Sequence, residues 1–141
     1  MHLILDGYAQ DKEFLTNADR ISQWLLKVVK EIGMQAMGQP YLVNFGLGAG
    51  ITGVLIIKES HICIHTWPEF SGLQVDCCSC RSFNAAIFTG SICKEAMIDR
   101  PATLILQRGV KGNELIRPKL ALGVAMIEAE RERPKGGLIL R

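Results

Sequence analysis

Residues 51–69 read ITGVLIIKESHICIHTWPE, and they contain two apolar runs on either side of a short polar break. The runs are residues 54–57 and 61–65, and the break is Lys58-Glu59-Ser60. Short runs rich in Val and Ile are typical of β-strands. Proline cannot donate to a strand ladder, so Trp67-Pro68 is expected to end the second strand. The stretch therefore predicts two strands that follow each other directly along the chain.

The rest of the chain supplies further strands and two long helices. We expect strands at 2–8, 41–45, 73–78 and 103–106. A helix from about Thr16 to Ile32 is predicted by one apolar stripe at helical spacing. The stripe consists of Ile21, Trp24, Leu25, Val28, Val29 and Ile32. A less regular helix is expected over residues 82–98, with Ser82 as its N-cap, and a short one over 120–129.

These elements predict an α+β fold. Because several strands are adjacent in sequence, we expect a two-layer α/β sandwich, with a largely antiparallel sheet covered on one face by two main helices. The 141 residues are expected to form a single domain, 1–141. A hydrophobic share of 48% and a charged share of 21% exclude intrinsic disorder.

Charge and hydropathy exclude two classes of partner. A formal net charge of +2 is too small for electrostatic binding of nucleic acid, and no apolar run approaches the length that spans a membrane. The start of the chain lacks a basic n-region, so we expect no signal peptide. Five cysteines, an odd number, without an export signal then indicate a reduced, cytoplasmic protein.

Three short motifs have simple structural interpretations. Gly48–Gly53 satisfies G-x-G-x-x-G, but a strand-like run follows instead of a helix, so we interpret it as a loop. Cys77-Cys78-Ser79-Cys80 contains C-x-x-C without a second pair, and we interpret Cys77 and Cys78 as small core residues. His61 and His65 share a strand face but lie too far apart to chelate one metal ion. We therefore expect no metal site.

The segment Glu59–Glu69, ESHICIHTWPE, carries a stronger signal. It resembles the signature E-S-H-x-x-I-H-T-W-P-E of the prokaryotic S-adenosylmethionine decarboxylase proenzymes. The likeness continues through Val75-Asp76 to Cys80, and residues 50–54 (GITGV) resemble the family's G-V-S-G-V. About thirty contiguous positions carry the specific part, and a weaker likeness extends over residues 2–108.

The resemblance implies that the chain makes its own cofactor. Ser60 would attack the carbonyl of Glu59, and scission would give a β chain, 1–59, and an α chain, 60–141. Ser60 would then become a pyruvoyl group, with no metal required. His65 corresponds to the processing base, and Thr52 stands where the family has a processing serine.

The resemblance also implies an enzyme of polyamine biosynthesis. The pyruvoyl carbonyl would form a Schiff base with the substrate amine and promote loss of carbon dioxide. Cys80 corresponds to the proton donor, and a free thiol is mostly protonated at neutral pH. Glu69 corresponds to the carboxylate that binds the ribose hydroxyls, and Phe45 to the aromatic residue that stacks on adenine. A homodimer with sites near its interface is implied.

The chain also departs from the family pattern. The usual H-K-F-x-P before the glycine loop is absent, and Phe45 aligns with its aromatic only through a one-residue insertion. Residues beyond about 110 have no counterpart. The expected substrate is S-adenosylmethionine. Two alternatives stay open: an arginine or ornithine decarboxylase on the same scaffold, or a non-catalytic regulatory relative.

Overall fold

The computed structural model describes residues 1–111 and 114–120. The strands are β1 (His2–Tyr8), β2 (Tyr41–Asn44), β3 (Ile51–Ile57), β4 (Ser60–Trp67), β5 (Gly72–Ser79), β6 (Ala102–Lys111) and β7 (Glu114–Leu120). The helices are α1 (Ala18–Glu31) and α2 (Ala85–Ala96), with short 3-10 turns η1 (Phe14–Thr16) and η2 (Pro68–Phe70).

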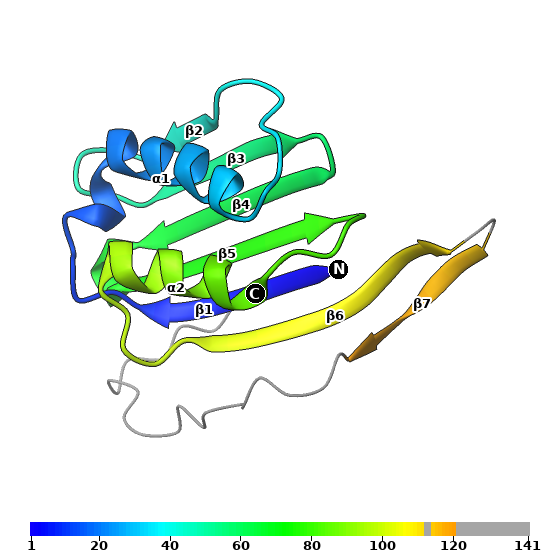
Figure 1. The fold of residues 1–141 in the computed structure, drawn as a ribbon. Helices are drawn as coiled ribbons and strands as arrows, with labels where there is room; N and C mark the ends of the chain where they lie inside the picture. Colours follow the sequence, from blue (N-terminus) through cyan, green and yellow to red (C-terminus); the bar gives the residue numbers. More distant parts are fainter. Residues whose placement is uncertain (112–113, 121–141) are drawn as a thin grey trace.

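The strands form one antiparallel sheet in the order β2-β3-β4-β5-β1-β6-β7. Both helices lie on the same face of this sheet, and the second half of β6, paired with β7, extends beyond the other strands (Figure 1). The predicted α+β two-layer sandwich is confirmed. The hairpin partner β7 was not predicted, and the helix expected over residues 120–129 lies, beyond Leu120, outside the described residues.

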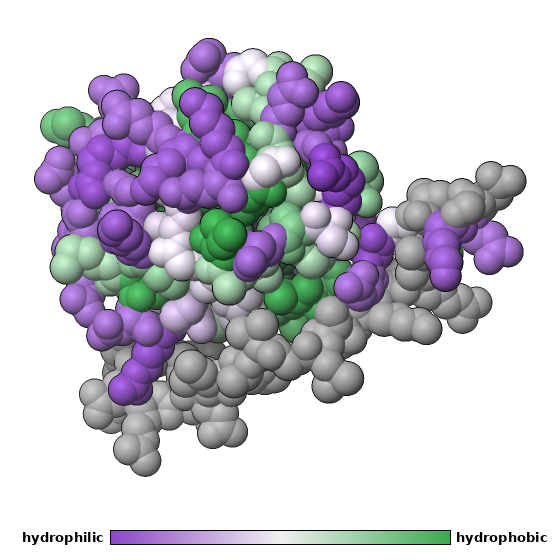
Figure 2. Space-filling model, viewed as in Figure 1, coloured by the Kyte–Doolittle hydropathy of each residue, from purple (hydrophilic) through white to green (hydrophobic). Residues whose placement is uncertain are grey.

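The core lies between the helices and the sheet. The apolar stripe of α1 is buried as predicted, and Trp24 packs edge-on against Phe88 of α2 with ring centroids 6.0 Å apart. The opposite side of α1 carries hydrophilic side chains, which Figure 2 shows on this face of the molecule. The helices therefore cover one face of the sheet and leave the other face open.

Both helices begin later than the sequence suggested. The helix expected from about Thr16 starts at Ala18, because the side chain of Asn17 caps it by accepting the backbone N–H of Arg20 at 3.0 Å. Asn84, and not Ser82, caps α2, and its side chain accepts the N–H groups of Ala86 and Ile87. Asparagine is a strong N-cap because its side-chain oxygen satisfies amides that have no partner inside the helix.

Strand β4 sets the two faces of the sheet. Ile62, Ile64 and Thr66 point to the buried side, as the alternation of a strand requires. His61 and His65 point to the open face together with Cys63. Because β4 lies between β3 and β5, its open-face side chains are flanked by those of both neighbours.

Candidate functional site

The beginning of β4 brings the Glu59–Ser60 peptide bond beside Cys80. Lys58 and Glu59 form the turn between β3 and β4, and Ser60 pairs with Ser79 at the end of β5. The backbone N–H of Cys80 donates to the carbonyl oxygen of Glu59 at 3.0 Å. An amide aimed at a carbonyl stabilises negative charge that develops on that oxygen.

Ser60 has an unusual backbone conformation. Its φ is +150°, in a region that is costly for any residue with a side chain. Such strain costs about 1–3 kcal/mol and persists only where the surrounding structure enforces it. Here the turn and the pairing with Ser79 enforce it at the bond that the sequence predicts to break.

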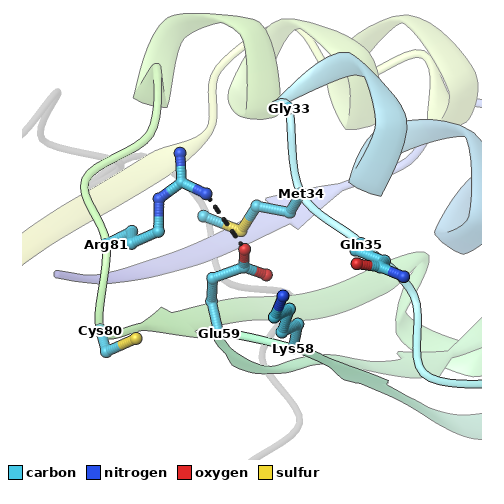
Figure 3. Close-up of a pocket in the computed structure, with 7 residues that line it drawn as sticks. All are labelled: Gly33, Met34, Gln35, Lys58, Glu59, Cys80 and Arg81. Carbon is cyan, nitrogen blue, oxygen red and sulfur yellow. Dashed lines mark hydrogen bonds and ion pairs between the residues drawn. The ribbon is translucent and has the colours of Figure 1, made fainter.

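Glu59 is held in place by its own side chain. The carboxylate is buried and accepts from Arg81 at 3.3 Å, and no hydrogen-bond partner among the described residues reaches its second oxygen. A cavity of about 390 Å³ adjoins the pair. Its lining comprises Gly33, Met34, Gln35, Lys58, Glu59, Cys80 and Arg81, and Figure 3 shows Arg81 reaching toward Glu59 beside Cys80. Burial and the ion pair with Arg81 therefore hold Glu59, the residue before the predicted cleavage, in place.

A polar cluster continues from Ser60 across the open face. The Ser60 hydroxyl lies 3.0 Å from Nδ1 of His61, and Nε2 of His61 lies 3.6 Å from Oδ2 of Asp76. The same carboxylate oxygen is 3.0 Å from Nε2 of His2. His61, Cys63 and Asp76 have ligand atoms within 4.8 Å of one another. The sequence analysis missed this cluster because it considered metal binding only by His61 and His65, which lie on one strand. Pairing of β4 with the predicted strand 73–78 would have placed Asp76 beside Cys63.

The far end of β4 holds a second group. Thr52 of β3 is opposite His65 in the register, and its hydroxyl hydrogen-bonds to Nδ1 of that histidine. The His65 ring lies 4.0 Å from the ring of Trp67 and 5.8 Å from that of Phe45, centroid to centroid. Burial lowers the pKa of His65, while the negative charge of Glu69 acts in the opposite direction. A neutral imidazole beside a hydroxyl is suited to accepting a proton.

The predicted site residues thus form two groups, not one. Glu59, Ser60 and Cys80 gather at the start of β4, whereas Thr52, His65, Phe45 and Glu69 gather near its end. His65 follows Ser60 by five positions along the extended strand, which corresponds to about 17 Å. A cavity of about 270 Å³ lies on the open face, and its lining includes Thr52, Cys63, His65 and Asp76.

The cysteines differ strongly in setting. Cys77 is buried in the core as predicted, and burial raises its pKa to about 12. The interpretation of Cys78 as a core residue is wrong: alternation in β5 turns it to the open face, where it is half-buried. Burial also raises the pKa of Cys63, to about 11. Cys80 is exposed, because it follows the last residue of β5.

The glycine motif lies in a loop, as the sequence suggested. Residues 46–50 connect β2 to β3, and β3 begins at Ile51. A Cβ on Gly50 would lie 2.1 Å from the carbonyl oxygen of Thr66, so only glycine fits this close backbone approach. Among the described residues, no helix is long and apolar enough to cross a membrane.

Comparison with known proteins points to one family. The family model described as S-adenosylmethionine decarboxylase matches residues 1–109. S-adenosylmethionine decarboxylase proenzymes of Thermosipho africanus and Thermococcus onnurineus are 37% and 38% identical over 79 residues, which is 56% of this chain. The match spans 59% and 55% of those relatives, less than two thirds of their length. The crystal structure of an adenosylmethionine decarboxylase from Aquifex aeolicus superimposes with a TM-score of 0.66 at 25% identity. It covers 82% of this chain and 95% of that one.

Proposed function

Since the chain belongs to the S-adenosylmethionine decarboxylase family, we propose that it is a self-processing, pyruvoyl-dependent decarboxylase of polyamine biosynthesis. The observation that carries the proposal is the Glu59–Ser60 bond itself. Its serine is strained, and its carbonyl oxygen already accepts the N–H of Cys80. A peptide bond in this setting is prepared for attack by the serine hydroxyl, since the attack releases strain and places charge on the held oxygen.

Maturation proceeds by two bond changes. The hydroxyl of Ser60 attacks the carbonyl carbon of Glu59, and the C–N bond breaks to leave an ester and a free amine. A base then takes the α-proton of Ser60, and Glu59 departs as a carboxylate, leaving a double bond between Cα and Cβ. Addition of water releases ammonia and leaves a pyruvoyl group at residue 60, with chains 1–59 and 60–141.

We assign the second step to His65 of another copy of the chain. The lowered pKa keeps His65 neutral near pH 7, and Thr52 orients its ring. Yet about 17 Å of strand separates it from Ser60 within one chain, too far for a proton transfer. His65 therefore serves the Ser60 of a second copy.

The open face of the sheet is where the second copy binds. When two sheets pack face to face about a two-fold axis that lies between them and crosses the middle of β4 at a right angle to the strand, one β4 runs opposite to the other. The His65 end of one strand then lies near the Ser60 end of its partner. The open face also exposes apolar side chains, which two copies would bury together: Tyr8, Tyr41, Val43, Ile56 and Leu104.

The same packing completes the substrate site. A pyruvoyl group at residue 60 supplies the electron sink for loss of carbon dioxide, so the reaction requires no metal. Cys80, which is exposed beside residue 59, protonates the substrate carbon. Phe45, 61% exposed, offers a ring for adenine, and Glu69 offers acceptors for the ribose hydroxyls.

S-adenosylmethionine is the proposed substrate, because both relatives named above and the superimposed structure are adenosylmethionine decarboxylases. Nothing comparable supports arginine or ornithine, or a non-catalytic role. We place the enzyme in the cytoplasm, since its five cysteines are free thiols. Release of carbon dioxide from S-adenosylmethionine, arginine and ornithine, assayed in parallel, tests the assignment. A higher kcat/KM for either amino acid would contradict the substrate and leave the cleavage proposal standing.

The direct test of self-processing is a denaturing mass measurement on the purified chain. We expect two fragments, 1–59 and 60–141, with the second lacking a free amino terminus. Ser60→Ala should remain one chain of 141 residues, because alanine has no hydroxyl to attack the bond. An intact wild-type chain, or cleavage at another bond, would contradict the proposal.

A further inference from the structure

His61 is the histidine that touches the serine to be converted. Its Nδ1 lies 3.0 Å from the hydroxyl oxygen of Ser60, within the range in which a base can take a hydroxyl proton. His65, the histidine of the processing motif, lies at the other end of β4 and is hydrogen-bonded to Thr52. The two histidines therefore occupy different positions relative to the bond that breaks.

The neighbours of His61 determine which of its nitrogens is free. Arg108 can only donate, so its contact at 3.1 Å makes Nδ1 of His2 the acceptor and puts the proton of His2 on Nε2. That N–H donates to Oδ2 of Asp76 at 3.0 Å. The same carboxylate oxygen faces Nε2 of His61 at 3.6 Å and favours the tautomer with its proton there.

This tautomer leaves the Nδ1 lone pair of His61 facing the Ser60 hydroxyl. A nucleophile, a base and an orienting carboxylate thus follow one another as Ser60, His61 and Asp76, from the beginning of β4 to β5. Hydroxyl nucleophiles are activated in enzymes by this type of arrangement. Cys63 lies on the same face near His61 and Asp76, but among the described residues it makes no hydrogen bond to Ser60, and the proposed step does not use it.

We infer that His61 is the general base for the first step of self-cleavage, oriented by Asp76, and that His65 acts only in the second step. This inference rests on the proposed function. The proton of the Ser60 hydroxyl passes to Nδ1 of His61 as the oxygen bonds to the carbonyl carbon of Glu59. The carbonyl electron pair moves onto the oxygen that accepts the Cys80 N–H. When the C–N bond breaks, the same proton passes from Nδ1 to the nitrogen of Ser60, so His61 returns to its starting state.

The two roles predict different blocked states, and hydroxylamine distinguishes them because it cleaves esters far faster than amides. Precursor is unfolded, refolded, and followed by intact mass with and without hydroxylamine. In His61→Ala the amide should persist, and the first step should slow by on the order of 10²–10⁴-fold, the usual contribution of a general base. Hydroxylamine should release little fragment from it. In His65→Ala the ester should accumulate, and hydroxylamine should cut it at residue 59.

Free imidazole added to His61→Ala should restore cleavage, which would not follow if His61 only supported the fold. Asp76→Asn should slow the first step as well, because the amide no longer fixes the tautomer. Cys78→Ala, opposite His61 on β5, is the matched control on the same face and should process at the wild-type rate. His61→Asn replaces His61→Ala if that variant does not refold, as judged by circular dichroism.

The inference is overturned if a folded His61 variant processes at the wild-type rate, or if it accumulates hydroxylamine-sensitive ester. Both outcomes require a wild-type chain that cleaves. If the wild-type chain stays whole, the proposed function fails first, so the two failures are distinguishable.

Discussion

The two ends of β4 differ in what they offer to the reaction. The start of the strand holds a strained serine, a carbonyl with an amide donor and a buried carboxylate paired with Arg81. The far end holds a histidine with a lowered pKa among aromatic rings, hydrogen-bonded to Thr52. One end carries the bond that we propose to break, and the other carries the proposed base and ligand surface. Residues that are continuous in the sequence motif are thus divided in space, as the proposed use of two copies requires.

The largest expected effect comes from mixing chains that are each defective at one end. Ser60→Ala and His65→Ala should each fail to mature alone. When the two are refolded together, the His65→Ala chain retains Ser60 and can receive His65 from its partner. We expect scission of the His65→Ala chain only, which a mass tag on one chain identifies.

Refolding each variant alone at the same total concentration provides the control. If the mixture yields no scission while the wild type cleaves, His65 acts on its own chain and the second-copy assignment is wrong. Cleavage of the Ser60→Ala chain would contradict the identity of the nucleophile.

The next effect separates the two cysteines near the start of β4. Cys80→Ala should mature and then lose on the order of 10²–10⁴-fold in kcat, because the substrate carbon no longer receives its proton. Cys78→Ala should retain activity, since Cys78 lies two residues before Cys80, within β5, and among the described residues its side chain makes no hydrogen bond to residue 59 or 60. Carbon dioxide release at saturating substrate measures both. Equal losses would show that Cys80 has no special role.

A smaller effect is a shift in pH dependence at the far end. Burial stabilises the neutral imidazole of His65, so its pKa lies below the usual histidine value near 6.5. The elimination step needs the neutral form, so its rate should begin to decline at a lower pH than it would with an unshifted histidine. Below the lowered pKa it should decline about tenfold per pH unit. Ester accumulated at acidic pH and then transferred to each test pH reports this step alone.

Glu69→Gln sharpens the same measurement. The charge of Glu69 raises the pKa of His65 against the effect of burial. Removing that charge should therefore move the declining limb to still lower pH. A shift to higher pH would mean that Glu69 does not act on His65 through its charge.

The local structure followed from the sequence where a periodic pattern was strong. The stripe of α1 and the runs on either side of Lys58-Glu59 predicted the helix face, the strands and the buried side of the sheet. The α2 cap was missed because Asn84 competes with Ser82, a choice that backbone geometry decides. Cys78 was wrongly predicted to lie in the core, because the burial of a strand residue depends on which face of the sheet the helices cover.

The sequence motif proposes site residues but does not give their arrangement. It points to Ser60, His65 and Cys80, yet a motif does not say that Ser60 and His65 lie at opposite ends of a strand. Asp76 lies on β5 and His2 on β1, and strand pairing brings both of them near His61, which contacts Ser60. Those contacts depend on register, which single-strand periodicity does not contain.

The smallest expected effect compares two glycines, one of them at the His65 end. Gly50→Ala would drive a Cβ against the carbonyl oxygen of Thr66 and displace the loop between Phe45 and Thr52. Overpacking of this kind costs about 1–3 kcal/mol, and Tm should fall by about 2–4 °C per kcal/mol. Gly90→Ala is the control, because Gly90 lies in α2 and no atom of the described residues lies within 4 Å of its added Cβ. Alanine favours a helix interior by about 0.5–1 kcal/mol, so Tm should rise there.

Gly50→Ala should also slow the elimination step, because Thr52 moves, and should leave formation of the ester at Ser60 unchanged. Equal slowing of both steps would mean that the two ends of β4 do not act independently.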